Sequence, residues 1–158
     1  MKIGKYLDLA DLIHSDTADR MHIDQTPPNE VQDALTNVVK FVYDPVCDHL
    51  GSVHVNSGYR SPALNKTIGG ATTSQHCKGE ALDLSFNGMK SVNTNSTIFH
   101  YILHNLDFDQ LIWEFGTDKN PQWVHVSYST HFNRKEVLKS MKVNGKTVYQ
   151  TFDPTLTA

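Results

Sequence analysis

Two residues of this sequence, His76 and Asp83, have the types and the spacing of metal ligands. They stand seven residues apart in the segment SQHCKGEALD, and Gly79 lies between them. Glycine tolerates a sharp turn, so a histidine in a loop and an aspartate on the strand that follows can converge. Zinc takes neutral imidazole nitrogens and carboxylate oxygens, and a catalytic zinc site has three protein ligands and an open position. If these two residues bind zinc, a third ligand is expected elsewhere in the chain.

The third candidate is His125, in the segment QWVHVSY. Its neighbours Val124 and Val126 point to the other face of a predicted strand, which leaves the imidazole on a rigid element. Taken alone, the pattern is weak, because a strand histidine is more often a packed residue than a ligand. Cys77 follows His76 directly, and we expect it to point away from the site. We expect the other seven of the nine histidines to be surface or packing residues: His14, His22, His49, His54, His100, His104 and His131.

Helical and strand patterns around these residues predict an α+β fold. Helices are predicted for residues 5–14, for a segment capped by Asn29 that runs to about Tyr43 and restarts at Pro45 before Gly51, for the segment after Ser61, and for 93–106. Strands are predicted for residues 52–60, 80–86, 108–116 and 122–128. Because the helices come first and the strands pair mostly in antiparallel fashion, we expect a central sheet with N-terminal helices packed on it.

Alternation along the strands predicts where their side chains point. In EALDLSF, Asp83 shares a face with small residues, and Leu82 and Leu84 share the other. The strands 108–116 and 122–128 are expected to form a hairpin, and Asn144-Gly145 predicts another over about 136–152. We expect one domain over 1–158, with its core over about 15–130 and the second hairpin after it.

Composition excludes several classes of protein. The 158 residues are 39% hydrophobic and 20% charged, as in a globular domain, and the net charge of −3 gives no basic patch for nucleic acid. No segment approaches the about 20 apolar residues of a membrane span. Asp8 and Asp11 interrupt the N-terminal region where a signal peptide would be apolar, so we expect cytoplasmic synthesis and release by another route, such as a lysis system. Cys47 and Cys77 are expected to be free thiols, and the chain a monomer.

Three segments in order, SGYRSPALN, SQHCKGEALD and WVHVSY, resemble the zinc D-alanyl-D-alanine carboxypeptidases and the related phage L-alanyl-D-glutamate endopeptidases. That family shares its fold with the hedgehog signalling domain. Its central pattern, S-x-H-x-x-G-x-A-x-D, is matched at every fixed position: Ser74, His76, Gly79, Ala81 and Asp83. The resemblance covers residues from about 15 to about 130 and is closest to the short carboxypeptidase-like proteins of phages and bacteria.

The resemblance implies one Zn²⁺ held by His76, Asp83 and His125. It also implies that the substrate is a peptidoglycan stem peptide and that the chain is a phage or prophage protein. It also implies that Arg60 contacts the substrate, where a guanidinium can grip a carboxylate and steady an oxyanion. A surface ion pair is the alternative role for Arg60. Ser74 is either a substrate-binding hydroxyl or a turn-forming serine. Arg60 slightly favours a terminal D-Ala–D-Ala bond over an internal L-Ala–D-Glu bond, because it suits a free carboxylate.

The general base is where the sequence departs from the family. Well-known members have an acid three residues before the second zinc histidine, and here that residue is Gln122, which cannot take a proton. Glu114 is the best remaining candidate, because a hairpin would bring it near His125. A structural carboxylate is its alternative role. Asp109 and Asp118 are weaker candidates.

The sequence leaves two other functions open. The chain could bind zinc without catalysis, as a structural or binding module of the same fold, and Gln122 favours this reading. It could also be a metal-free helper of phage assembly, which the complete set of ligands argues against.

Overall fold

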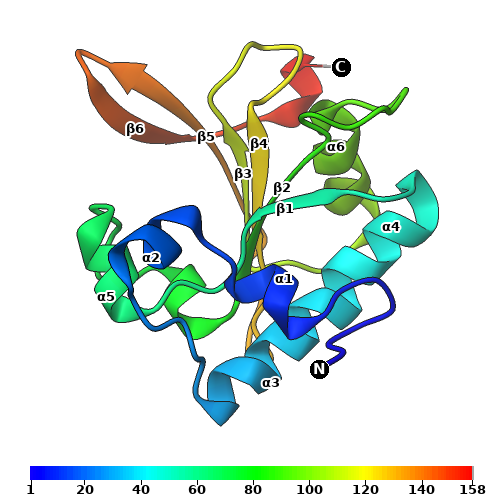
Figure 1. Cartoon of the computed structure of the whole chain (residues 1–158). Coiled ribbons are helices and arrows are strands. Elements are labelled where there is room, and N and C mark those ends of the chain that lie inside the picture. Colours follow the sequence, from blue (N-terminus) through cyan, green and yellow to red (C-terminus); the bar gives the residue numbers. More distant parts are fainter. Residues whose placement is uncertain (158) are drawn as a thin grey trace.

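A six-stranded sheet runs through the centre of the computed structural model, which describes residues 1–157 (Figure 1). Its strand order is β1-β2-β4-β3-β5-β6, and every neighbouring pair is antiparallel except β3 and β5. The strands are β1 (His54–Ser57), β2 (Ala81–Ser85), β3 (Gln110–Glu114), β4 (Trp123–Ser127), β5 (Glu136–Val143) and β6 (Lys146–Thr151). The predicted α+β fold with a mostly antiparallel sheet is confirmed.

Helices surround this sheet. They are α1 (Leu9–Ile13), α2 (Asp16–Met21), α3 (Asn29–Val38), α4 (Asp44–Leu50), α5 (Pro62–Thr67) and α6 (Asn95–Asn105), with short 3₁₀ segments at Gln75–Lys78 and Pro154–Thr157. Figure 1 shows α3, α4 and α6 on one side of the sheet and α5 on the other, with the β5–β6 hairpin projecting toward the side of α5. The face toward α3, α4 and α6 is thus covered by helices, and part of the opposite face is left for a site.

The second predicted helix is interrupted as its proline indicates. Pro45 has no N–H to donate, and the turn before it widens into a π-helix, Val39–Tyr43, in which the N–H of Asp44 donates to the carbonyl of Val39. The prediction that Asn29 caps this helix is wrong: Pro28 is the cap, and Asn29 is the first helical residue. The expected C-cap at Gly51 is confirmed, with a φ of 85°. Helix α2 was not predicted.

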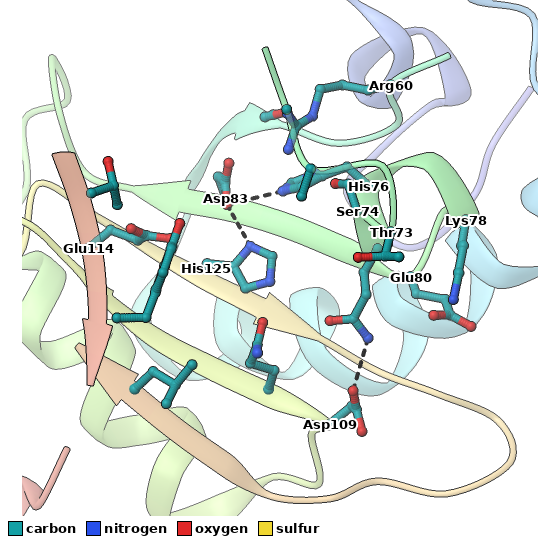
Figure 2. A pocket seen from close by; sticks show the side chains of 18 of the residues that line it. Arg60, Thr73, Ser74, His76, Lys78, Glu80, Asp83, Asp109, Glu114 and His125 are labelled. Carbon is teal, nitrogen blue, oxygen red and sulfur yellow. Dashed lines mark hydrogen bonds and ion pairs between the residues drawn. The ribbon is translucent and has the colours of Figure 1, made fainter. Parts of the chain in front are cut away.

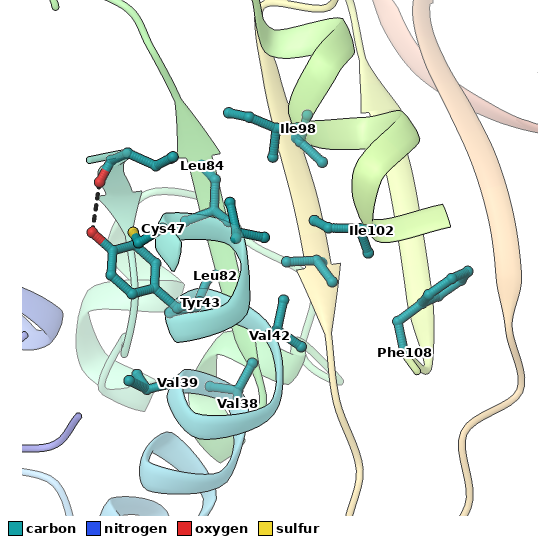
Figure 3. Packing of buried hydrophobic residues seen from close by; sticks show 14 of the residues in the cluster. Val38, Val39, Val42, Tyr43, Cys47, Leu82, Leu84, Ile98, Ile102 and Phe108 are labelled. Carbon is teal, nitrogen blue, oxygen red and sulfur yellow. Dashed lines mark hydrogen bonds between the residues drawn. The ribbon is translucent and has the colours of Figure 1, made fainter. Parts of the chain in front are cut away.

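The hydrophobic core lies between the sheet and its helical cover. Leu82 and Leu84 of β2 point into it, beside Val38 and Val42 from the long helical segment and Ile98 from α6 (Figure 3). Each of these side chains is fully buried. Because side chains alternate along a strand, the residues between these apolar positions face the opposite side of the sheet. This alternation places Asp83 and His125 on the open face.

The C-terminal hairpin extends the sheet. Asn144 and Gly145 both have positive φ, of 51° and 77°, as the two-residue turn predicted here requires. The parallel pairing of β5 with β3 was not predicted, and it places the hairpin beside the end of β3. Cys47 and Cys77 are free thiols, as expected. Among the described residues, no helix is long and apolar enough to span a membrane.

Candidate metal centre

Strand register brings Asp83 and His125 together. They are direct partners in the antiparallel β2–β4 pair, and Ile112 of β3 stands on the other side of His125. His76 reaches the same point from the 3₁₀ helix Gln75–Lys78, which leads through Gly79 into β2. Gly79 has a φ of 72°, so the predicted sharp turn is confirmed.

The three side chains converge on one carboxylate oxygen. His76 Nε2 lies 3.3 Å from Asp83 Oδ1, and His125 Nδ1 lies 3.1 Å from the same oxygen (Figure 2). All three atoms lie within 4.8 Å of one another. A tetrahedral zinc ion about 2.0–2.2 Å from each ligand holds neighbouring ligand atoms about 3.3–3.6 Å apart. The spacing and the chemistry of these donors therefore fit zinc.

His76 is held in the tautomer that a metal needs. Its Nδ1 lies 2.7 Å from the carbonyl oxygen of Gly58. Because a carbonyl can only accept, Nδ1 donates its proton to Gly58, and Nε2 is the nitrogen left to donate to Asp83 or, without its proton, to bind a metal. The N–H of Arg60 in turn donates to the carbonyl of His76 at 3.2 Å. The backbone next to β1 thus orients this imidazole.

The pairing of His125 leaves one of its nitrogens without a partner. Its Nδ1 faces Asp83, and its Nε2 is buried with no hydrogen-bond partner among the described residues. The residue is only 8% exposed, so Nε2 is poorly placed to form a hydrogen bond with bulk water.

Asp83 has the ionisation state that a cation needs. Burial by itself raises the pKa of Asp83, but the charges of His76 and His125 and their hydrogen bonds outweigh it. The pKa of this carboxyl therefore lies well below its usual range. Asp83 is a carboxylate at neutral pH.

Glu114 lies on the same face of the sheet, at the end of β3. It is two residues from Ile112, the strand partner of His125, and is 6% exposed. The hydroxyl of Ser140 in β5 donates to Glu114 Oε2. Burial raises the pKa of Glu114, and the charge of Asp83 raises it further, while Ser140 and His125 act in the opposite direction with less effect. A buried carboxyl with a raised pKa beside a metal site is suited to proton transfer.

The family-model comparison decides the class of protein. A model described as Peptidase M15 matches residues 5–127, which include every residue of the site described so far except Ser140. The chain belongs to the Peptidase M15 family. Peptidases of this family depend on zinc, so the chain is a zinc metallopeptidase by family, with donors that fit the ion. A comparison with curated proteins finds no match.

Arg60 lines the cleft of this M15 peptidase, as Figure 2 shows. Its Nη1 donates a long hydrogen bond of 3.4 Å to Asn65 Oδ1, and its Nε is buried without a partner among the described residues. Within that part of the chain Arg60 forms no ion pair, which disfavours the surface ion pair that the sequence left open. Most of its donors are available to a ligand.

Ser74 also lines the cleft. Its backbone carbonyl accepts from the N–H of Cys77 and so starts the 3₁₀ helix, but its hydroxyl has no hydrogen-bond partner among residues 1–157. The hydroxyl is therefore not the group that forms the turn. The substrate-binding role stays a prediction.

Gln122 and the two weaker candidate bases, Asp118 and Asp109, are placed differently from Glu114. Gln122 is exposed just before β4 and does not line the cleft of the M15 site. Asp118 is exposed and pairs with Lys139. Asp109 does line the cleft, but Arg134 holds both of its oxygens at 3.0 and 2.8 Å and Gln75 donates to it as well, so its pKa falls to about 2. So low a pKa makes Asp109 a poor proton acceptor.

The cleft of the M15 site is large, with a volume of about 1560 Å³. Pockets for small ligands are about 300–1,000 Å³, so this cleft has room for an extended peptide. Its walls include the loop before His76, the loop 129–134 and the inner face of the β5–β6 hairpin. Sequence reasoning missed the hairpin wall and Ser140. The Asn-Gly turn predicts the hairpin, but no local pattern predicts that it packs beside Glu114.

A second group of ligand-type residues lies at the surface. His14, Asp16 and Asp19 also bring donor atoms within 4.8 Å of one another, but all three are exposed. Their contacts are ion pairs at the start of α2. Exposed groups of this kind are common without a metal, which agrees with the prediction that His14 is a surface residue.

Proposed function

We propose that this M15 peptidase hydrolyses peptide bonds of peptidoglycan, with zinc held by His76, Asp83 and His125. The observation that carries the proposal is the convergence of two imidazole nitrogens on Asp83 Oδ1, at 3.3 and 3.1 Å, inside a cleft that can hold a peptide. When bound, zinc supplies a water of pKa about 7 and polarises the carbonyl of the scissile bond. One chain supplies the whole site, so a monomer suffices.

Glu114 moves the proton in this proposal. Peptide hydrolysis needs a group that takes a proton from water and gives it to the leaving amine. Glu114 lies on the face of the sheet that carries His125, and its raised pKa suits both steps. Ser140 donates to one carboxylate oxygen, and the other has no hydrogen-bond partner among the described residues. Glu114 thus takes the role that Gln122, outside the cleft, cannot fill.

Arg60 binds the substrate in this proposal. Its guanidinium has unused donors in the cleft and can grip a carboxylate through two parallel hydrogen bonds. A stem peptide that ends in D-Ala–D-Ala offers a carboxylate one residue from the scissile bond. We therefore favour the carboxypeptidase reaction over cleavage of the internal L-Ala–D-Glu bond, which has no terminal carboxylate nearby.

Mass spectrometry of purified peptidoglycan after digestion tests the proposal. The zinc-loaded protein should release D-alanine or fragments cut at one defined bond, and a chelator should stop the release. Loss of D-alanine indicates the carboxypeptidase, and fragments beginning with D-glutamate indicate the endopeptidase. If the zinc-loaded protein yields no chelator-sensitive product from any wall preparation, the function is wrong, and the non-catalytic zinc-binding module becomes the better reading.

A further inference from the structure

The β5–β6 hairpin forms a wall of the cleft although it lies outside the residues matched to the family. Figure 1 shows it projecting from the sheet on the side of α5, across from the helices that cover the core. Side chains from one face of the hairpin line the cleft: Leu138, Lys142, Thr147 and Tyr149. The family match ends at residue 127, before the hairpin begins. This wall therefore lies outside the part of the chain that the family model matches.

Strand register places Tyr149 in line with Glu114. Glu114 pairs with Ser140 across β3 and β5, and Ser140 pairs with Tyr149 across β5 and β6. Directly paired residues of neighbouring strands point to the same face of a sheet. Tyr149 therefore stands on the face that carries Asp83 and His125, next to the Ser140–Glu114 hydrogen bond.

The charged groups of the site affect the pKa of the Tyr149 phenol. Partial burial raises the pKa of Tyr149, the negative charges of Glu114 and Asp83 raise it further, and Arg60 acts in the opposite direction. Tyr149 lines the same cleft as Glu114, Asp83 and Arg60, the charged groups that act on its pKa. A raised pKa also keeps the O–H protonated, which makes it a hydrogen-bond donor at neutral pH.

Within the part of the chain that the structure describes, no group accepts a hydrogen bond from that donor. Tyr149 is 53% exposed, and its hydroxyl has no hydrogen-bond partner among residues 1–157. Its ring makes no aromatic contact within the same residues. Phe152, three residues later, differs in that its ring packs on Trp113. A role in packing explains Phe152 and does not explain Tyr149. The free donor points to a ligand.

We propose that Tyr149 is a substrate-contacting residue, whose hydroxyl donates a hydrogen bond to a backbone carbonyl of a peptide lying between the β5–β6 hairpin and the three ligands His76, Asp83 and His125. This inference rests on the proposed function. The hairpin then sets how the peptide lies in the cleft. Arg60 binds the same peptide from the segment beside the 3₁₀ helix, where its N–H donates to the carbonyl of His76.

Two substitutions test the contact. Tyr149→Phe removes only the hydroxyl, and it should raise KM for a D-Ala–D-Ala stem peptide about ten-fold while kcat changes less than about two-fold, because the bond forms before the chemical step. Val148→Ala is the matched control, since Val148 belongs to the same strand but faces the other way and is 39% exposed. The control should keep both constants within about two-fold. All variants should melt at the wild-type temperature.

Calorimetry of the same peptide adds a measurement that does not depend on turnover. In a zinc-loaded Glu114→Gln background, adding Tyr149→Phe should weaken peptide binding by about the same ten-fold. If the wild type cleaves the peptide but Tyr149→Phe changes neither KM nor affinity, this inference is wrong and the proposed function stands. If the wild type neither cleaves nor binds any wall peptide, the proposed function fails and the inference fails with it.

Discussion

Asp83 Oδ1 is the atom on which both histidines converge, and the sequence indicates why. A motif of five fixed positions includes His76 and Asp83, and strand alternation points Asp83 away from Leu82 and Leu84. Both features are local in the sequence, so they can be predicted without a structure. The partners that orient the ligands are not local: the Gly58 carbonyl lies 18 residues before His76 in the chain.

Glu114→Gln tests the proton-transfer step at the scale of one residue. The substitution keeps the shape of the side chain and its bond to Ser140 but cannot accept a proton. We expect turnover to fall by about 10²–10⁴-fold with zinc content unchanged, as measured by steady-state kinetics and elemental analysis.

Gln122→Ala is the matched control for that variant. Gln122 occupies the position where the family has an acid, but its side chain is exposed outside the cleft. Its replacement should leave kcat/KM within about two-fold. A fully active Glu114→Gln, or a large loss in Gln122→Ala, would move the base away from Glu114.

The surroundings of the proposed base, Glu114, show the limit of prediction from local sequence. The hairpin of β3 and β4 follows from alternation and the turn between them, and it correctly puts Glu114 near His125. Ser140 could not be found in the same way, because its contact depends on the parallel pairing of β5 with β3. Parallel partners are joined by long connections, and no short-range signal specifies them.

At the scale of elements, Gly79 controls how the 3₁₀ helix of His76 enters β2. It has a φ of 72°, and a Cβ built there would lie 2.6 Å from the carbonyl oxygen of Val31 in α3. Gly79→Ala should therefore lower the free energy of unfolding by about 2 kcal/mol or more, through strain and collision. Urea unfolding of the variant and the wild type measures this loss in the free energy of unfolding.

Gly145→Ala is the control for backbone strain alone. Gly145 has a similar φ of 77°, but a Cβ there meets nothing within 4 Å. We expect a cost of about 1 kcal/mol and unchanged zinc affinity, whereas Gly79→Ala should also weaken zinc binding. Equal effects of the two substitutions would show that the contact with α3 is unimportant.

Asp109 joins the start of β3 to the loop of Arg134 and to Gln75, the neighbour of His76. Hydrogen bonds from Arg134 are the main cause of its pKa of about 2, below the ordinary value near 3.8. A lowered pKa in the folded state stabilises the fold above about pH 4, and this contribution is lost as the pH falls toward 2.

Asp109→Asn should therefore destabilise the protein by about 1–3 kcal/mol at pH 7, measured by urea unfolding. The difference from wild type should shrink as the pH falls from 5 toward 2. Asp118→Asn is the control, because Asp118 is exposed and its ion pair with Lys139 should contribute little to stability. A difference that stays constant down to low pH would contradict the assigned role of Asp109.

At the scale of the whole molecule, the sequence predicts the two layers better than the boundaries within them. Periodicity predicts the helices that cover Leu82 and Leu84, because burial on one face leaves a regular pattern. It does not predict α2, whose six residues carry only one buried side chain, Ala18. Short elements with little buried surface leave little pattern.

Zinc binding should be coupled to global stability, because the ligands come from β2, β4 and the 3₁₀ helix and meet only in the folded chain. A free zinc concentration 1,000 times the Kd should add about 4 kcal/mol. This corresponds to a rise in Tm of about 8–16 °C for a domain of this size, measured calorimetrically with zinc and with chelator. His125→Ala should show little of this rise; an equal rise in that variant would place the stabilising zinc elsewhere.

The claim that one zinc ion is held by His76, Asp83 and His125 is tested most directly by elemental analysis of the protein purified without chelators. The wild type should contain one zinc per chain, and His76→Ala and His125→Ala should each contain almost none. The surface variant His14→Ala should retain the full amount, since His14 belongs to the exposed group at α2. A zinc-free wild type, or full zinc content in both ligand variants, would contradict the account.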